Sequence, residues 1–221
     1  MFEGLTAPRD LRGLCNSAAS EWHSIITRLE YTDAYRHAVS MLIPAKAQPL
    51  RVMDVGCGAG SFAYAYVQVR GRVEVLTLAD PAAYMLHEAS SYLDGAATEI
   101  LLLERGIETL PAFPSQDLIL CAHVTEHCAD PVAAIRSLGP ALAPKGMILL
   151  IVSKPHWCHR LVWPHWRHRR YKPTRILEAI VAAGLVRPRD MGFAGGTPSR
   201  TSHACLISKT QPEIRYADCH R

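Results

Sequence analysis

The spacing of apolar residues divides the chain into a helical first part and a second part in which strands and helices alternate. Over residues 9–43 the apolar positions recur at intervals of three and four, which predicts helix in two pieces. Asp33 is expected to cap the second piece, 34–42, and Pro44 follows its end. One stripe of the first piece predicts a packing or dimer face, and it consists of Trp22, Ile25, Ile26 and Leu29.

From Leu50 onward, short β-like runs alternate with stretches of helical spacing. The expected strands are 50–55, 73–79, 99–104, 117–122 and 147–152, and the expected helices between them are 60–69, 82–93 and 130–142. A helix over 173–183 and a terminal hairpin of 185–193 and 203–209, joined by residues 195–198, complete the chain. This order predicts an α/β fold with a parallel sheet covered on both faces.

Proline and aspartate mark the ends of one of these helices. Asp130 followed by Pro131 predicts a capped helix start, since a carboxylate accepts free N–H groups and proline suits the first helical position. Pro140 is expected to interrupt the same helix.

A glycine-rich turn follows the strand 50–55. Gly56, Gly58 and Gly60 allow a sharp turn and a close approach of a ligand to the backbone. The helix that begins there offers unpaired N–H groups. Asp80 ends the next strand, about 20 residues further on, where an acid can accept two ribose hydroxyls. The unit therefore predicts binding of a cofactor that contains a nucleoside.

The glycine spacing narrows the kind of cofactor. A dinucleotide fingerprint needs a third glycine at position 61 or 63, where the chain has Ser61 and Ala63, and no Gly-Lys-Ser/Thr of a P-loop is present. A nicotinamide oxidoreductase is therefore disfavoured. The pattern from Asp54, Asp-x-Gly-x-Gly-x-Gly, closely resembles the first motif of the class I S-adenosylmethionine (SAM)-dependent methyltransferases.

The resemblance extends over about residues 50–210. Further segments that look like those of the family are 110–120, 125–131, 142–146 and 177–185. It implies a Rossmann-like, doubly wound sheet of seven strands with the last strand antiparallel, and methylation of a small molecule with SAM as cofactor. The domains expected on this basis are an N-terminal helical lid (1–48), a SAM-binding domain (49–210) and a tail (211–221).

The resemblance also implies which residues hold the cofactor. The family often carries an acid near the adenine where this chain has Gly106, so the backbone of Ile107 or the side chain of Glu108 is expected to serve instead. The full expected set is Asp54, Gly56, Cys57, Gly58, Gly60, Asp80, Pro81, Gly106, Ile107, Glu108, Cys121, Ala122 and His123.

His123 is the first candidate for catalysis. It follows strand 117–122 at the carboxyl edge of the sheet, where ligands of open α/β folds bind. A neutral histidine suits the removal of a proton from a hydroxyl acceptor, and packing beside the cofactor is an equal alternative. His127 matches a histidine common in the family and is expected to contact the acceptor, and a structural hydrogen bond is preferred for it over catalysis. Glu126 is interpreted as a loop or capping residue.

The segment 153–172 is expected to line the site that binds the methyl acceptor. Trp157, Trp163 and Trp166 supply flat apolar area, which suits an aromatic or phenolic acceptor, and His156 and His159 are further candidates for catalysis. A metal site is a minority interpretation, because the histidine spacing matches no closed zinc site. Tyr31 and Tyr35 are expected to contact the acceptor or the methionine end of the cofactor, with interhelix packing as the alternative.

Composition and charge limit the remaining classes. The 221 residues are 49% hydrophobic, with no apolar run long enough to span a bilayer and no signal peptide read at the N-terminus. Seven cysteines without a Cys-x-x-Cys indicate a reduced, cytoplasmic protein, and a homodimer is left open. The net charge is only +4, and one basic run, 165–172, carries much of it. A small molecule is therefore preferred over a nucleic acid as the binding partner.

Two alternatives to a small-molecule methyltransferase stay open. One is an RNA or tRNA methyltransferase, although residues 121–124 lack the motif of amino-methylating DNA enzymes and no Pro-Cys occurs. The other is a SAM-binding protein of the same fold without activity.

Overall fold

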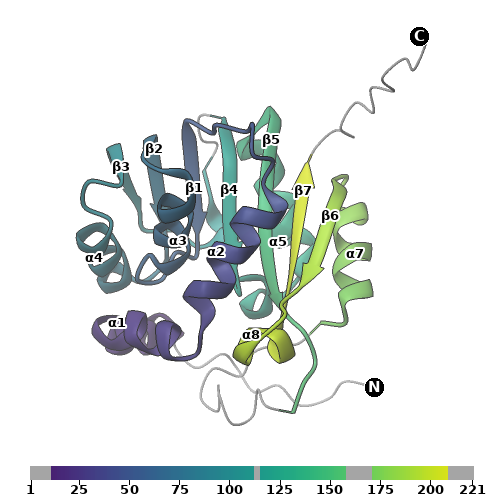
Figure 1. The fold of residues 1–221 in the computed structure, drawn as a ribbon, viewed down its shortest axis with the longest axis horizontal. Coiled ribbons are helices and arrows are strands. Elements are labelled where there is room, and N and C mark those ends of the chain that lie inside the picture. The colour runs from purple at the N-terminus through teal and green to yellow at the C-terminus, as the bar shows by residue number, and fades with distance from the viewer. Residues whose placement is uncertain (1–10, 112–114, 158–170, 209–221) are drawn as a thin grey trace.

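The computed structural model describes residues 11–111, 115–157 and 171–208 of the chain. Within these ranges seven strands form one sheet in the order β3-β2-β1-β4-β5-β7-β6 (Figure 1). β7 runs antiparallel to both of its neighbours, and the other pairs are parallel. The predicted fold class, with its antiparallel last strand, is confirmed. The strands are β1 (Arg51–Val55), β2 (Val73–Ala79), β3 (Ala97–Leu103), β4 (Gln116–Ala122), β5 (Leu142–Ser153), β6 (Val186–Gly192) and β7 (Ser202–Ser208).

Helices cover both faces of this sheet. Their bounds are α1 (Leu11–Arg28), α2 (Tyr31–Leu42), α3 (Ser61–Arg70), α4 (Ala83–Tyr92), α5 (Pro131–Leu138), α7 (Pro173–Ala182) and α8 (Gly196–Thr201). The apolar side chains of α2, α3 and α4 share one core with residues such as Leu78 and Leu120 of the sheet. Those of α5 and α7 pack on the opposite face, against Ile119 and Leu150. Alternate residues of each strand thus point into different cores, as a doubly covered sheet requires.

The order of the strands places a crevice between β1 and β4. The chain moves outward from β1 to β2 and β3, and then returns to β4 on the other side of β1. At such a switch point the loops after the two central strands diverge, and ligands bind outside the carboxyl ends. α1 lies at this edge of the sheet (Figure 1). The fold therefore provides a site closed on one side by the N-terminal helices.

The start of α2 differs from the prediction. The helix begins at Tyr31, directly after Glu30, whose backbone φ of 64° forms a left-handed turn at the end of α1. Asp33 lies in the first turn of α2 and pairs with Arg36. The prediction of Asp33 as the cap was wrong because the turn at Glu30 restarts the helix three residues earlier.

The ends of α5 follow the sequence signals. The Asp130 carboxylate accepts the backbone N–H groups of Val132 (2.8 Å) and Ala133 (3.2 Å), so the predicted cap is confirmed. The helix ends at Leu138, and a 3₁₀ turn around Pro140 follows because proline has no N–H to continue the α pattern. The connection between β6 and β7, predicted as a hairpin loop, contains the short helix α8.

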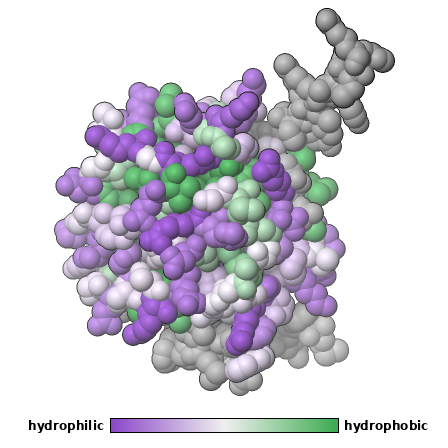
Figure 2. Space-filling model, viewed as in Figure 1, coloured by the Kyte–Doolittle hydropathy of each residue, from purple (hydrophilic) through white to green (hydrophobic). Residues whose placement is uncertain are grey.

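The surface of the molecule is mixed. Figure 2 shows a mostly polar face, with apolar residues gathered in its upper half. Ile26 is buried, and Trp22, Ile25 and Leu29 pack against the core, so the stripe on α1 is a packing face. Among the residues described, no helix has the length and hydropathy needed to cross a membrane.

Candidate functional site

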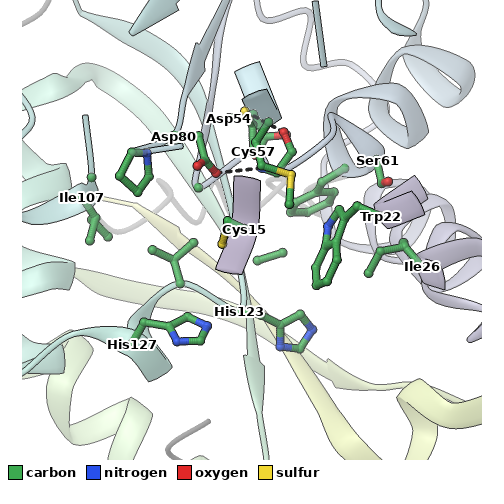
Figure 3. Close-up of a pocket in the computed structure, with 18 of the residues that line it drawn as sticks. Cys15, Trp22, Ile26, Asp54, Cys57, Ser61, Asp80, Ile107, His123 and His127 are labelled. Atoms are coloured by element: carbon green, nitrogen blue, oxygen red, sulfur yellow. Dashed lines mark hydrogen bonds between the residues drawn. The ribbon is translucent and has the colours of Figure 1, made fainter. Parts of the chain in front are cut away.

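A cavity of about 400 Å³ lies at the carboxyl ends of β1, β2 and β4. Loops after four strands form its walls, together with α1 and α2 (Figure 3). The residues predicted to hold a cofactor that line it are Asp54, Gly56, Cys57, Gly58, Asp80, Pro81, Gly106, Ile107, Glu108, Ala122 and His123. Tyr31, Tyr35 and His127, predicted for the acceptor, line it as well. Gly60 and Cys121 do not line it. Gly60 caps α3, and Cys121 on β4 is buried in the core that α5 and α7 cover.

The glycine turn after β1 requires its glycines. Gly56, Gly58 and Gly60 have φ values of 66°, 51° and 85°, which side-chain-bearing residues rarely adopt. A Cβ on Gly56 would lie 2.2 Å from Cγ2 of Val124, and one on Gly58 would lie 2.9 Å from Nε1 of Trp22. The glycines therefore let the turn approach both the loop after β4 and helix α1.

Two buried acids flank this turn. The Asp80 carboxylate accepts the backbone N–H of Gly58 (3.0 Å) with one oxygen and that of Ala82 (2.9 Å) with the other. Asp54 accepts the N–H of Ala63 at the start of α3 (3.0 Å). Burial raises the pKa of Asp80 and raises that of Asp54 to about 8. Each Asp80 oxygen has one donor among the described residues, so lone pairs remain for hydroxyl groups in the cavity.

The turn after β3 forms another part of the wall. Ile107 is buried, and with Glu108 it begins a 3₁₀ turn that reaches the cavity. Gly106 has extended backbone, and a Cβ there would meet nothing within 4 Å. This glycine is not sterically required, in contrast to those of the turn after β1.

His123 lies on the other side of the cavity from Asp54 and Asp80 (Figure 3). Its φ of 59° places a non-glycine residue in the left-handed region, at a cost of roughly 1–2 kcal/mol. Its N–H donates to the carbonyl of Ile151 on β5 (2.8 Å), and its ring meets Tyr31 edge-on at 5.3 Å. A histidine that adopts a strained backbone at a cavity wall is a candidate for function.

Among the described residues, the ring of His123 has hydrogen-bond partners at Nδ1 and none at Nε2. Nδ1 lies 3.2 Å from Oε1 of Glu126 and 3.0 Å from Oγ of Ser153. Nε2 is buried and has no hydrogen-bond partner among the described residues. Glu126 does not cap the following helix, which Asp130 caps; its side chain reaches back to the N–H of Ser153 at the end of β5.

Aromatic and imidazole groups complete this side of the cavity. The Tyr31 hydroxyl bonds with that of Thr201 (2.8 Å), and Tyr35 packs on Phe62 at 4.6 Å between ring centres. Burial raises the pKa of Tyr35 well above its usual range and lowers that of His127. At neutral pH the side chains of Tyr35 and His127 are therefore uncharged.

The structure does not bring the described part of the loop 153–172 into the cavity. His156 and Trp157 face each other at 5.6 Å between ring centres, and Trp157 is exposed. His159, Trp163 and Trp166 lie outside the described residues. The described residues contain no cluster of three or more metal-ligating side chains. The acceptor wall predicted for this loop stays a prediction.

Several lining residues were missed by the sequence analysis. Cys15, Trp22 and Ile26 stand on one face of α1, at intervals of seven and four residues, but helical spacing alone does not distinguish a cavity wall from a core. The other residues missed are Ser61, Phe62, Met85, Thr109, Val124 and Cys128. Ser61 and Phe62 follow the glycine turn directly, and that adjacency was an available signal.

The order of the strands and the antiparallel β7 define a Rossmann-like fold. The glycine turn beside the buried Asp80 is typical of a site that binds a nucleoside. A family model described as a methyltransferase domain matches residues 27–179. The chain belongs to this methyltransferase family.

Named relatives share parts of the chain. A ubiquinone biosynthesis O-methyltransferase of Xanthomonas axonopodis pv. citri is 32% identical over 125 residues, which cover 56% of this chain and 47% of the relative. The chain spans about half the length of the curated relatives it matches.

Solved structures share the fold at low sequence identity. Magnesium protoporphyrin IX methyltransferase of Synechocystis PCC 6803, crystallised with S-adenosylhomocysteine (SAH), superposes with a TM-score of 0.72 at 16% identity, covering 90% of this chain and 98% of that one. A 1,6-didemethyltoxoflavin-N1-methyltransferase of Burkholderia thailandensis gives 0.73 at 16% identity, covering 96% and 94%.

Proposed function

We propose that this chain transfers a methyl group from SAM to a hydroxyl group of a small, aromatic acceptor. The observation that carries the proposal is a cavity lined on one side by the turn of left-handed glycines and buried Asp80, and on the other side by His123. The named O-methyltransferase relative supports oxygen as the atom methylated.

The residues present fit the cofactor. Gly56 and Gly58 leave the wall free of side chains, and Asp80 retains lone pairs for two ribose hydroxyls. Ile107 and Glu108 supply the wall for the adenine. SAM supplies an electrophilic methyl group on its sulfonium. The protein's part is to hold this group in line with the acceptor and to keep water out.

The opposite side suits the acceptor. Tyr31, Tyr35, Trp22 and Ile26 offer flat, mainly apolar surface, which binds an aromatic ring. His123 accepts the hydroxyl proton at Nε2 while the oxygen attacks. A base held within the cavity gives typically 10²- to 10⁴-fold in rate.

Two measurements test the proposal. Calorimetric titration with SAH is expected to show one site per chain, and tritiated SAM is expected to label a catechol in preference to an aniline or a thiol. The matched control is Gly95→Ala, since Gly95 has a left-handed φ of 76° but lies outside the cavity, and it should leave both results unchanged. A wild-type protein that binds no SAH at millimolar concentration contradicts the proposal.

A cytoplasmic location and a homodimer also stay predictions. Light scattering of the purified chain measures the second, and a monomer at micromolar concentration contradicts it.

A further inference from the structure

The surroundings of the His123 ring are asymmetric. Glu126 Oε1 and Ser153 Oγ both face Nδ1, at 3.2 and 3.0 Å, while Nε2 is buried and has no hydrogen-bond partner among the described residues. The Glu126 side chain has no exposed surface. The two ring nitrogens therefore differ in their surroundings. Nδ1 faces a buried carboxylate, whereas Nε2 is buried without a hydrogen-bond partner among the described residues.

These surroundings select one tautomer. A neutral imidazole carries a single N–H, and a carboxylate can only accept hydrogen bonds. A hydrogen bond from His123 to Glu126 therefore requires the proton on Nδ1, which leaves the lone pair on Nε2. The carboxylate is itself fixed, since Oε1 accepts the N–H of Ser153 and Oε2 accepts the hydroxyl of Thr125 (3.0 Å).

Ser153 is the other group that faces Nδ1, and its hydroxyl can either accept from this nitrogen or donate to it. The remaining groups near the ring do not compete for Nδ1. The Tyr31 hydroxyl on α2 bonds with Thr201, and its ring meets His123 only by an edge. His127 lies on the same turn as Glu126, and burial disfavours its charged form. Tyr35 on α2 is neutral for the same reason. The Glu126 carboxylate is thus the charged group that faces Nδ1.

We propose that Glu126 is a positioning residue that fixes His123 in the Nδ1–H tautomer and stabilises the imidazolium formed when Nε2 takes a proton. In that step the O–H bond of the acceptor breaks, its electron pair stays on oxygen, and the proton joins Nε2. The charge that appears on the ring is balanced by Glu126, and the proton later passes to solvent. The role as a base rests on the proposed function, whereas the tautomer does not.

The tautomer is measured directly. Two-bond ¹H–¹⁵N spectra of the full chain labelled with ¹⁵N-histidine are assigned with His123→Asn, since asparagine tolerates the left-handed backbone. Wild type is expected to show the proton on Nδ1, and Glu126→Gln should keep it, because the amide oxygen can still accept. Glu126→Ala should populate the Nε2–H form. Wild type in the Nε2–H form, with Ser153 donating to Nδ1, overturns the proposal.

Rates separate positioning from mere structure. With tritiated SAM and catechol, Glu126→Gln should lower turnover roughly 3- to 10-fold and move the acidic limb of the rate profile to lower pH, because the imidazolium loses a neighbouring charge. Glu126→Ala should lose about 10- to 150-fold, so that glutamine partly rescues it. Equal rates in wild type and both variants overturn the proposal.

Two controls keep the outcomes distinct. Asp190→Asn makes the same kind of change beside another histidine, since Asp190 Oδ2 lies 3.1 Å from Nε2 of His203 outside the cavity. It should alter only the His203 signals and leave turnover unchanged. SAH affinity should be unchanged in Glu126→Gln. Failure of wild type to bind SAH counts against the proposed function. If Glu126→Ala does not fold, the tautomer measured in wild type still decides the role of Glu126.

Discussion

Replacing Asp80 by alanine separates the binding of a ribose from the folding of the glycine turn. The carboxylate accepts the N–H groups of Gly58 and Ala82 and lines the cavity. Asp117 is a matched control, because one of its oxygens also accepts two backbone N–H groups, those of Leu50 (2.9 Å) and Arg51 (3.0 Å), but it lies outside the cavity. Asp117→Ala therefore removes the same number of backbone contacts without removing an acceptor for the cofactor.

The structure sets the expected magnitudes for the Asp80 variant. A hydrogen bond to a charged group contributes about 1.5–3 kcal/mol, so loss of the ribose contact should weaken SAH binding about 10- to 150-fold. Stability should fall by about 1–3 kcal/mol in Asp80→Ala, because buried N–H groups lose their acceptor. Removal of a buried carboxylate, whose pKa is raised, offsets part of that loss. Asp117→Ala should lose less stability, since its contacts are more exposed.

Calorimetric titration with SAH and urea unfolding measure the two quantities on the same samples. The expected pattern is a large loss of affinity in Asp80→Ala alone, at a stability that still leaves both variants folded. Unchanged SAH affinity in folded Asp80→Ala would refute the assignment of this acid to the ribose. Equal losses in both variants would show that the effect is one of folding.

Three further predictions concern the same cavity. Gly56→Ala should abolish SAH binding, because its Cβ would lie 2.2 Å from Val124. Gly95→Ala introduces the same left-handed strain without a clash and should bind SAH normally. Wild-type SAH affinity in Gly56→Ala contradicts this prediction. Burial raises the pKa of Asp54 to about 8, from about 3.9 in the unfolded chain. Between these two pH values the folded state therefore holds a proton that the unfolded state has lost. The free energy of unfolding should fall as pH rises through this range, by at most about 1.4 kcal/mol per pH unit. Urea unfolding of Asp54→Asn should lack that slope, and an equal slope in the variant rules out Asp54 as its source. His123→Gly should be more stable than His123→Ala by about 1 kcal/mol, since glycine tolerates a φ of 59°, and thermal unfolding in the opposite order argues against backbone strain.

The sequence was informative where the signal is local. The turn Gly56 to Gly60 and the acid at Asp80 could be interpreted directly, because the backbone conformations that they allow depend on neighbours in the chain. The strands and helices followed from the period of apolar positions, since each period defines one buried face. The start of α2 was missed because the left-handed turn at Glu30 carries no glycine to announce it.

The tertiary structure decided which side chains meet. Glu126 contacts Ser153, 27 residues further along, only because β4 and β5 are adjacent in the sheet. Trp22 lies against Gly58 because α1 packs at the carboxyl edge, and a helical stripe looks the same whether it faces a core or a cavity. The sequence alone therefore determined the cofactor turn, the acid beside it and the order of the elements. The contact of Glu126 with His123, and the burial of Nε2 without a partner among the described residues, depend on long-range register, which no local pattern encodes.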